Sequence, residues 1–146
     1  MYLLCKEDIY LIHREVIKDF GGDSSYYHNT EGRVESILSQ QYGCFGYDKY
    51  PTVFDKAAML MYFFIKGHCF CDGNKRVGLD SAVVFLTLNG FDDNIDGLEG
   101  YYKTIEIAKL QLKGEEVDNY IKHLSKWFFL YIVIVTSEEI GKLLEI

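Results

Sequence analysis

Two apolar helical patterns in this sequence are separated by one short polar stretch, residues 68–76, which reads HCFCDGNKR. On its N-terminal side, Thr52 and Asp55 form a capping-box pattern that begins a helix, and Gly67 ends that helix. On its C-terminal side, residues 77–88 are apolar almost all round, which is typical of a central, buried helix. The polar stretch is therefore predicted to be a loop that leads directly into the N-terminus of a buried helix.

Helical spacing of apolar residues continues on both sides of this pair. Two helices are predicted before a loop at residues 41–50, the second over residues 33–40, and two more after Asn89-Gly90. Their inward-facing residues are Ile9, Ile12, Val16 and Phe20; Val34, Ile37 and Leu38; Leu98, Tyr101, Ile105, Ala108 and Leu112; and Val117, Tyr120, Ile121 and Leu124. No alternating strand pattern competes with them before residue 130. The predicted fold class is therefore all-α, a compact helical bundle.

Composition narrows the class of protein. The chain has 146 residues, of which 49% are hydrophobic and 25% charged, as expected for one soluble globular domain. Its net charge of -7 opposes binding to a nucleic-acid backbone, because such binding relies on Lys and Arg. The four cysteines follow no secreted disulfide framework, and the longest apolar run, residues 127–135, is far shorter than the ~20 residues that span a bilayer. We therefore expect a cytoplasmic protein with reduced thiols, no nucleic-acid partner and no membrane partner.

The polar stretch carries residues suited to phosphate chemistry. Backbone N–H groups and the positive end of the helix dipole meet at a helix N-terminus, where they favour an anion. Gly73 permits close approach of the backbone, Arg76 can hold phosphate oxygens bidentately, and Lys75 adds a point charge. Asp72 offers a hard oxygen ligand for Mg²⁺, and the imidazole of His68 can take a proton from a hydroxyl.

Each of these residues also has a purely structural interpretation. Asp72 could cap the helix, and Lys75 and Arg76 could be solvated residues of its first turn. However, two cations at a helix N-terminus oppose the dipole, a misfit that is expected where an anion binds. A zinc site built on His68 and the cysteines lacks the usual ligand spacing. Phe70 is interpreted as an anchor that holds the loop in the core.

The stretch resembles the motif of the Fic/Doc family, which is written HxFxDGNKR in its death-on-curing branch, and seven of nine positions agree. The resemblance covers about residues 3–127 and includes Gly21-Gly22, Glu35-Ser36 and Tyr50-Pro51-Thr52-Val53-Phe54. It implies a Fic-type bundle as residues 1–127 and one role for each motif residue. His68 is the general base, Asp72 the magnesium ligand, Gly73 and Asn74 the start of an anion hole, and Lys75 and Arg76 phosphate contacts.

The resemblance also implies a function. A toxin-like kinase would transfer the γ-phosphate of ATP, bound with Mg²⁺, to a Ser or Thr hydroxyl of a target such as elongation factor Tu and so block translation. The alternatives are an adenylyltransferase and, in another class, a catalytically silent binding protein. No segment matches the self-inhibitory pattern [ST]xxxE[GN], so inhibition by an antitoxin in trans is expected.

Three features depart from the family pattern. Cys69 replaces the common Pro, and Asn29-Thr30 stands where many relatives have an Arg-Asp pair. Residues 128–146 match nothing in the family and are expected to form a C-terminal extension, which is a helical addition, a dimer contact or a peculiarity of this lineage. Within the extension, Ser137-Glu138-Glu139 could cap one more short helix.

Overall fold

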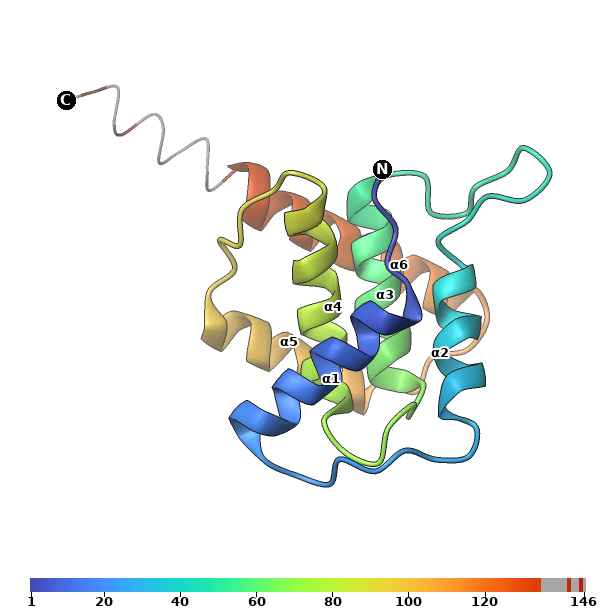
Figure 1. The fold of residues 1–146 in the computed structure, drawn as a ribbon. Coiled ribbons are helices and arrows are strands. Elements are labelled where there is room, and N and C mark those ends of the chain that lie inside the picture. Colours follow the sequence, from blue (N-terminus) through green and yellow to red (C-terminus); the bar gives the residue numbers. More distant parts are fainter. Residues whose placement is uncertain (135–141, 143–144, 146) are drawn as a thin grey trace.

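The computed structural model describes residues 1–134, together with 142 and 145. Its helices, in chain order, are α1 (Lys6–Phe20), α2 (Thr30–Ser39), α3 (Val53–Lys66), α4 (Asn74–Leu88), α5 (Gly97–Lys109), α6 (Glu115–Phe129) and a short π-helix, η1 (Leu130–Ile134). Among the described residues there are isolated β-bridges and no β-strand. The predicted all-α class is confirmed (Figure 1).

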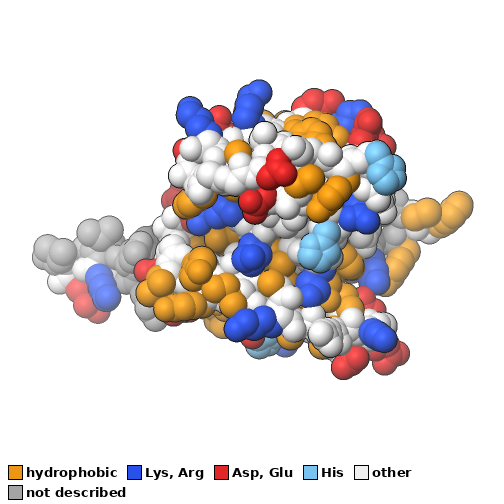
Figure 2. Space-filling model, turned by 90° about the horizontal axis from the view of Figure 1, so that it is seen from below, with side chains coloured by type: hydrophobic (Ala, Val, Ile, Leu, Met, Phe, Trp, Pro, Cys, Tyr) orange, Lys and Arg blue, Asp and Glu red, His pale blue; other side chains and the backbone are white. Residues whose placement is uncertain are grey.

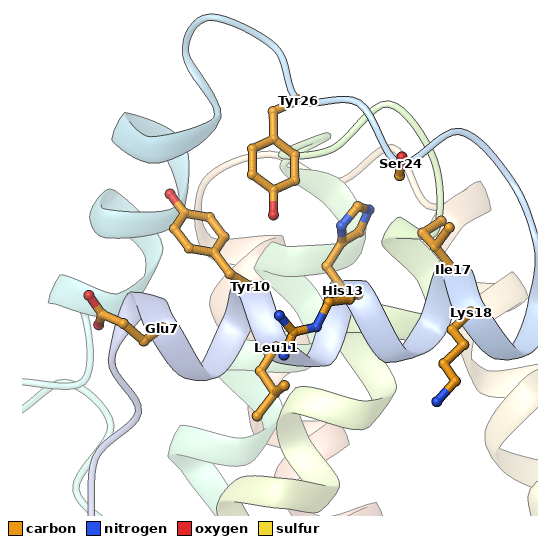
Figure 3. Close-up of a pocket in the computed structure, with 9 residues that line it drawn as sticks. Glu7, Tyr10, Leu11, His13, Ile17, Lys18, Ser24 and Tyr26 are labelled. Carbon is orange, nitrogen blue, oxygen red and sulfur yellow. The ribbon is translucent and has the colours of Figure 1, made fainter.

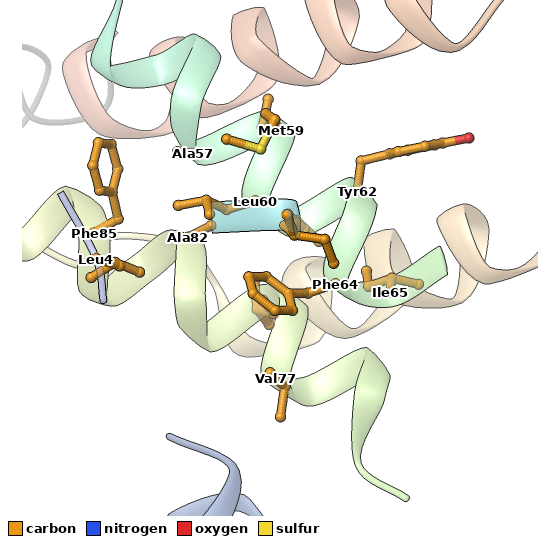
Figure 4. Packing of buried hydrophobic residues seen from close by; sticks show 14 of the residues in the cluster. Leu4, Ala57, Met59, Leu60, Tyr62, Phe64, Ile65, Val77, Ala82 and Phe85 are labelled. Atoms are coloured by element: carbon orange, nitrogen blue, oxygen red, sulfur yellow. The ribbon is translucent and has the colours of Figure 1, made fainter. Parts of the chain in front are cut away.

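The centre of the bundle is the antiparallel pair α3 and α4, with α1 across one side of it and α6 on the other (Figure 1). Every residue of 56–62 in α3 is buried, and its apolar side chains interdigitate with those of α4 (Figure 4). The two helices approach closely at Gly78, where an added Cβ would lie 2.5 Å from Ile65 and 2.9 Å from the Met61 carbonyl oxygen. This tight crossing fixes the start of α4 relative to the end of α3, on either side of the polar loop.

The predicted capping box begins α3. Thr52 Oγ1 accepts a hydrogen bond from Asp55 N at 3.1 Å, and Asp55 Oδ2 accepts one from Thr52 N at 3.1 Å. The second oxygen of the Asp55 carboxylate accepts from Ser125 Oγ at 2.7 Å and so ties α6 to the same helix end. In contrast, the residue that precedes α4 is Gly73, which has a φ of 85° and supplies no side-chain cap.

Two sequence predictions about buried faces are wrong. Phe20 was expected to face the core, but its side chain is 65% exposed at the end of α1. In α5 the expected inward residues Leu98, Tyr101 and Ala108 are exposed. That helix instead buries Gly100, Thr104 and Ile107, because Gly100 lets it approach Leu79 of α4. The buried face of α5 thus includes the small residues Gly100 and Thr104, which an apolar sequence pattern does not mark as buried.

Helix bounds differ from the predictions in detail. The second helix starts at Thr30, three residues before the predicted residue 33, and its predicted core residues, Val34, Ile37 and Leu38, are buried. The last α-helix ends at Phe129, and Phe128 and Ile132, which follow residue 127, are both in the hydrophobic core. The suggested cap at Ser137 lies outside the described residues. No helix in the described part of the chain combines the length and apolarity needed to cross a bilayer.

Candidate active site

A cleft of ≈ 530 Å³ opens at the end of the bundle that carries the polar loop. Figure 2 looks at this end, where Lys and Arg side chains lie among hydrophobic ones. The loop and the first turn of α4 form one side of the cleft, and the end of α1 and part of α5 form the rest. All the predicted site residues line it, namely His68, Asp72, Gly73, Asn74, Lys75 and Arg76.

The N-terminus of α4 is arranged to attract an anion. Its first turn contains no acidic residue, and the first amides of any α-helix lack an intrahelical partner. Gly73 N is already used, because it donates to Asp72 Oδ1 at 2.9 Å. The next amides, with the side chains of Lys75 and Arg76 beside them, therefore make up the cationic end of the cleft.

Asp72 lies where the end of α1 meets the loop. Its second carboxylate oxygen, Oδ2, accepts from Asp23 N at 3.3 Å. Gly22 passes so close that an added Cβ would be 2.5 Å from that oxygen, and its φ of 116° is one that favours glycine. Asp72 is the only carboxylate among the described residues that line the cleft. It fits a single protein ligand for Mg²⁺, whose other ligands would be phosphate oxygens and water.

The predicted anchor role of Phe70 is confirmed. Its side chain is 1% exposed and stacks on the ring of His13, with centroids 3.9 Å apart and an interplanar angle of 10°. His13 Nε2 lies 3.1 Å from the Asp72 carbonyl oxygen and donates to it in the matching tautomer. Burial lowers the pKa of His13 and so favours the neutral form of its ring.

The side chain of Asn74 closes the loop on itself, a contact that the sequence alone did not indicate. Asn74 Nδ2 donates to the Phe70 carbonyl at 2.8 Å, and Asn74 Oδ1 accepts from Phe70 N at 3.1 Å. The predicted anion hole can therefore use the backbone amide of Asn74 and not its carboxamide. A capping pattern of Asn with a residue four positions earlier could have suggested this contact.

Arg76 is held at the mouth of the cleft by two neighbours. Its Nε lies 3.1 Å from Asp80 Oδ1, one turn further along α4, and its guanidinium lies over the ring of Phe20 at 4.8 Å. Burial raises the pKa of Asp80, and the charge of Arg76 opposes that effect. The exposed ring of Phe20 thus helps to orient the guanidinium of Arg76.

The cleft also has an apolar wall that sequence reasoning missed. It consists of Ile65, Leu79 and the α5 residues Tyr101, Thr104 and Ala108. The Thr104 hydroxyl is not free, because it donates to the Tyr101 carbonyl at 2.7 Å. Lys66 Nζ, at the end of α3, donates to the carbonyls of Ala108 and Leu110 at 3.1 and 2.6 Å and so fixes this wall beside the loop.

A second groove of ≈ 490 Å³ lies on the opposite flank of α1 (Figure 3). The rings of Tyr10 and Tyr26 stack there, with centroids 5.4 Å apart. Tyr26 also forms an antiparallel bridge with Phe70 and therefore lies behind the polar loop. None of the predicted site residues lines this groove, whereas all of them line the first cleft.

Comparison with known proteins shows the family of the chain. The sequence model of the Fic/DOC family matches residues 3–86, which contain the polar loop and the start of α4. A protein kinase doc of Escherichia phage P1 is 31% identical over 84 residues, covering 58% of this chain and 65% of that protein. A toxin Doc of Mycolicibacterium smegmatis is 38% identical over 72 residues, covering 49% of this chain and 54% of that protein. The chain thus matches less than two thirds of the length of each relative.

Proposed function

Since the chain belongs to the Fic/DOC family, we propose that it is a toxin-like kinase that transfers the γ-phosphate of ATP to a Ser or Thr hydroxyl of a target protein. One observation carries the proposal. The cationic, acid-free N-terminus of α4 and the imidazole of His68 line the same cleft, with the single carboxylate of Asp72 between them in sequence. One bound nucleotide would therefore have a phosphate-binding site, a base and a metal ligand within reach.

The proposed reaction is an in-line displacement at the γ-phosphorus. His68 takes the proton of the target hydroxyl, the hydroxyl oxygen bonds to the γ-phosphorus, and the bond from that phosphorus to the β–γ bridging oxygen breaks to release ADP. Lys75, Arg76 and the first amides of α4 stabilise the charge that develops on the phosphate oxygens. Mg²⁺ held by Asp72 would neutralise part of that charge.

The proposed function also implies a target protein and a separate protein that inhibits the toxin. We infer that the target is a protein of the translation machinery such as elongation factor Tu, and that an antitoxin acts in trans. The inferred target and the type of reaction are tested by incubating the purified chain with bacterial lysate or purified elongation factor Tu and ATP labelled at the γ or the α position. Label from the γ position alone supports a kinase, and label from the α position supports AMP transfer. Absence of label from every protein would contradict both reactions.

The apolar wall on α5 supports a nucleotide as the ligand, because a purine ring would have an aromatic neighbour in Tyr101. We expect Tyr101→Ala to weaken binding of Mg-ATP roughly 5- to 100-fold, the range for loss of one base–aromatic stack. Binding of inorganic tripolyphosphate, which has no base, should not change. Calorimetry with both ligands measures the difference. Tyr102→Ala is the matched control, since Tyr102 is an exposed neighbour on α5 that lies outside the cleft.

Alanine substitutions at two adjacent glycines test whether Asp72 binds Mg²⁺. Both have a positive φ, so an alanine at either is strained and should lower the free energy of unfolding by about 1 kcal/mol. An added Cβ at Gly21 meets nothing within 4 Å, whereas one at Gly22 meets the Asp72 carboxylate. We therefore expect only Gly22→Ala to raise the Mg²⁺ concentration needed for transfer. Equal Mg²⁺ dependence of the two variants would argue against Asp72 as a metal ligand.

A further inference from the structure

The proposed base has an unusual backbone. His68 has a φ of 47°, and Phe45 is the other non-glycine residue with a positive φ in the described chain. This conformation is unfavourable for an L-residue with a side chain and persists only where surrounding contacts over-determine it. The contacts that hold the His68 backbone therefore decide where its imidazole lies.

Those contacts come from α2. Arg33 Nη1 donates to the carbonyl oxygens of Gly67 at 3.3 Å and His68 at 2.8 Å. Thr30 Oγ1, one helical turn earlier, donates to the carbonyl oxygen of Cys69 at 2.6 Å. Two side chains on one face of α2 thus bind three consecutive carbonyls of the loop that carries the base.

Both side chains are themselves held in place. Thr30 Oγ1 accepts from Tyr27 N at 2.8 Å. With its carboxamide turned to satisfy its neighbours, Asn29 accepts from Arg33 Nε and Nη2, each at 3.2 Å. The guanidinium is therefore hydrogen-bonded both to Asn29 and to the carbonyl oxygens of the loop. Asn29 and Thr30, which replace an Arg-Asp pair found in many relatives, contribute to this intramolecular network.

We propose that Arg33 and Thr30 are positioning residues that hold His68 in its unfavourable backbone conformation and so present its imidazole to the cleft. This inference rests on the proposed function, in which His68 is the base. Neither residue lines the cleft, and neither contacts Lys75 or Arg76, so the phosphate cradle at α4 does not depend on them. Their loss should impair transfer without impairing nucleotide binding.

The first test is Arg33→Ala in the full chain. We expect the transfer rate from Mg-ATP to fall about 10- to 100-fold, as for a catalytic group displaced by about 1 Å. The dissociation constant for Mg-ATP, measured by calorimetry, should stay within about twofold of the wild-type value. Arg33→Lys keeps one donor for the His68 carbonyl and should recover part of the rate. Arg14→Ala removes an exposed arginine of α1 outside the cleft and is the charge-matched control.

A double-mutant cycle separates positioning from a general structural role. If Arg33 acts through His68, then Arg33→Ala should cause no further loss of residual transfer in a His68→Ala background. Equal losses in both backgrounds would overturn the inference, as would full activity of a folded Arg33→Ala protein. A wild-type chain that neither binds Mg-ATP nor transfers phosphate would instead overturn the proposed function, and this inference with it.

Discussion

Replacement of His68 by alanine is expected to remove transfer almost completely while Mg-ATP still binds. The imidazole is exposed in the cleft, and its loss removes the proposed proton acceptor for the target hydroxyl. General-base catalysis is worth roughly 10²- to 10⁴-fold in rate, so the variant should lose that much. The amides and cations at the start of α4 are untouched, so the affinity for Mg-ATP should be close to that of the wild type. Transfer of labelled phosphate and calorimetry measure the two quantities.

Two other variants serve as comparisons for His68→Ala. His123→Ala removes an exposed histidine of α6 outside the cleft and should leave both quantities unchanged. Arg76→Ala should weaken nucleotide binding as well as transfer, because it removes a charge-assisted phosphate contact. A His68→Ala protein that folds, binds Mg-ATP and transfers at the wild-type rate would exclude His68 as the base.

Replacement of Lys75 by glycine should end phosphate transfer, because Lys75 is expected to decide how the nucleotide lies. Glycine at this position, as in adenylyl-transferring relatives, leaves room for the β- and γ-phosphates along the start of the helix. We expect the lysine side chain to occupy that room and add a charge, so that the γ-phosphate faces the hydroxyl instead. Only the phosphoryl group in line with the nucleophile is transferred. The wild-type chain should therefore add one phosphate to its target, and Lys75→Gly should add none.

Intact-mass measurement of the modified target decides between the two reactions. Addition of AMP by the wild-type chain would replace the kinase proposal with an adenylyltransferase. Glycine in a helix also costs about 1 kcal/mol of stability, so Lys122→Gly on the exposed side of α6 serves as the matched control. That control should lose a similar amount of stability and keep its activity.

Much of the fold could be predicted from the sequence because helix signals are local. The Thr52 cap, the stop at Gly67 and the apolar period of α3 follow from residues within a few positions of one another. The same holds for the position of the polar loop before α4, since residues 68–76 contain both the turn and the first helical residues. The candidate site was therefore recognised as one continuous segment.

The faces that helices bury were less predictable. In α5 the apolar period pointed to Leu98 and Tyr101, but Gly100, Thr104 and Ile107 are the residues that the helix buries. The packed face depends on how closely another helix can approach, which is a property of two segments together. As a result, Tyr101 lines the cleft and is not in the core. The residues around it in the sequence do not indicate this position.

By itself, the sequence determined the all-α class, the order of the helices and the segment that bears the proposed base, the proposed metal ligand and the cations. Only the tertiary structure decided that Arg33 and Thr30 bind the loop carbonyls, that Phe20 orients Arg76, and that Gly22 passes against Asp72. The physical reason is the range of the interactions. Helical hydrogen bonds join residues four positions apart, whereas these side chains find their partners only after distant helices have packed.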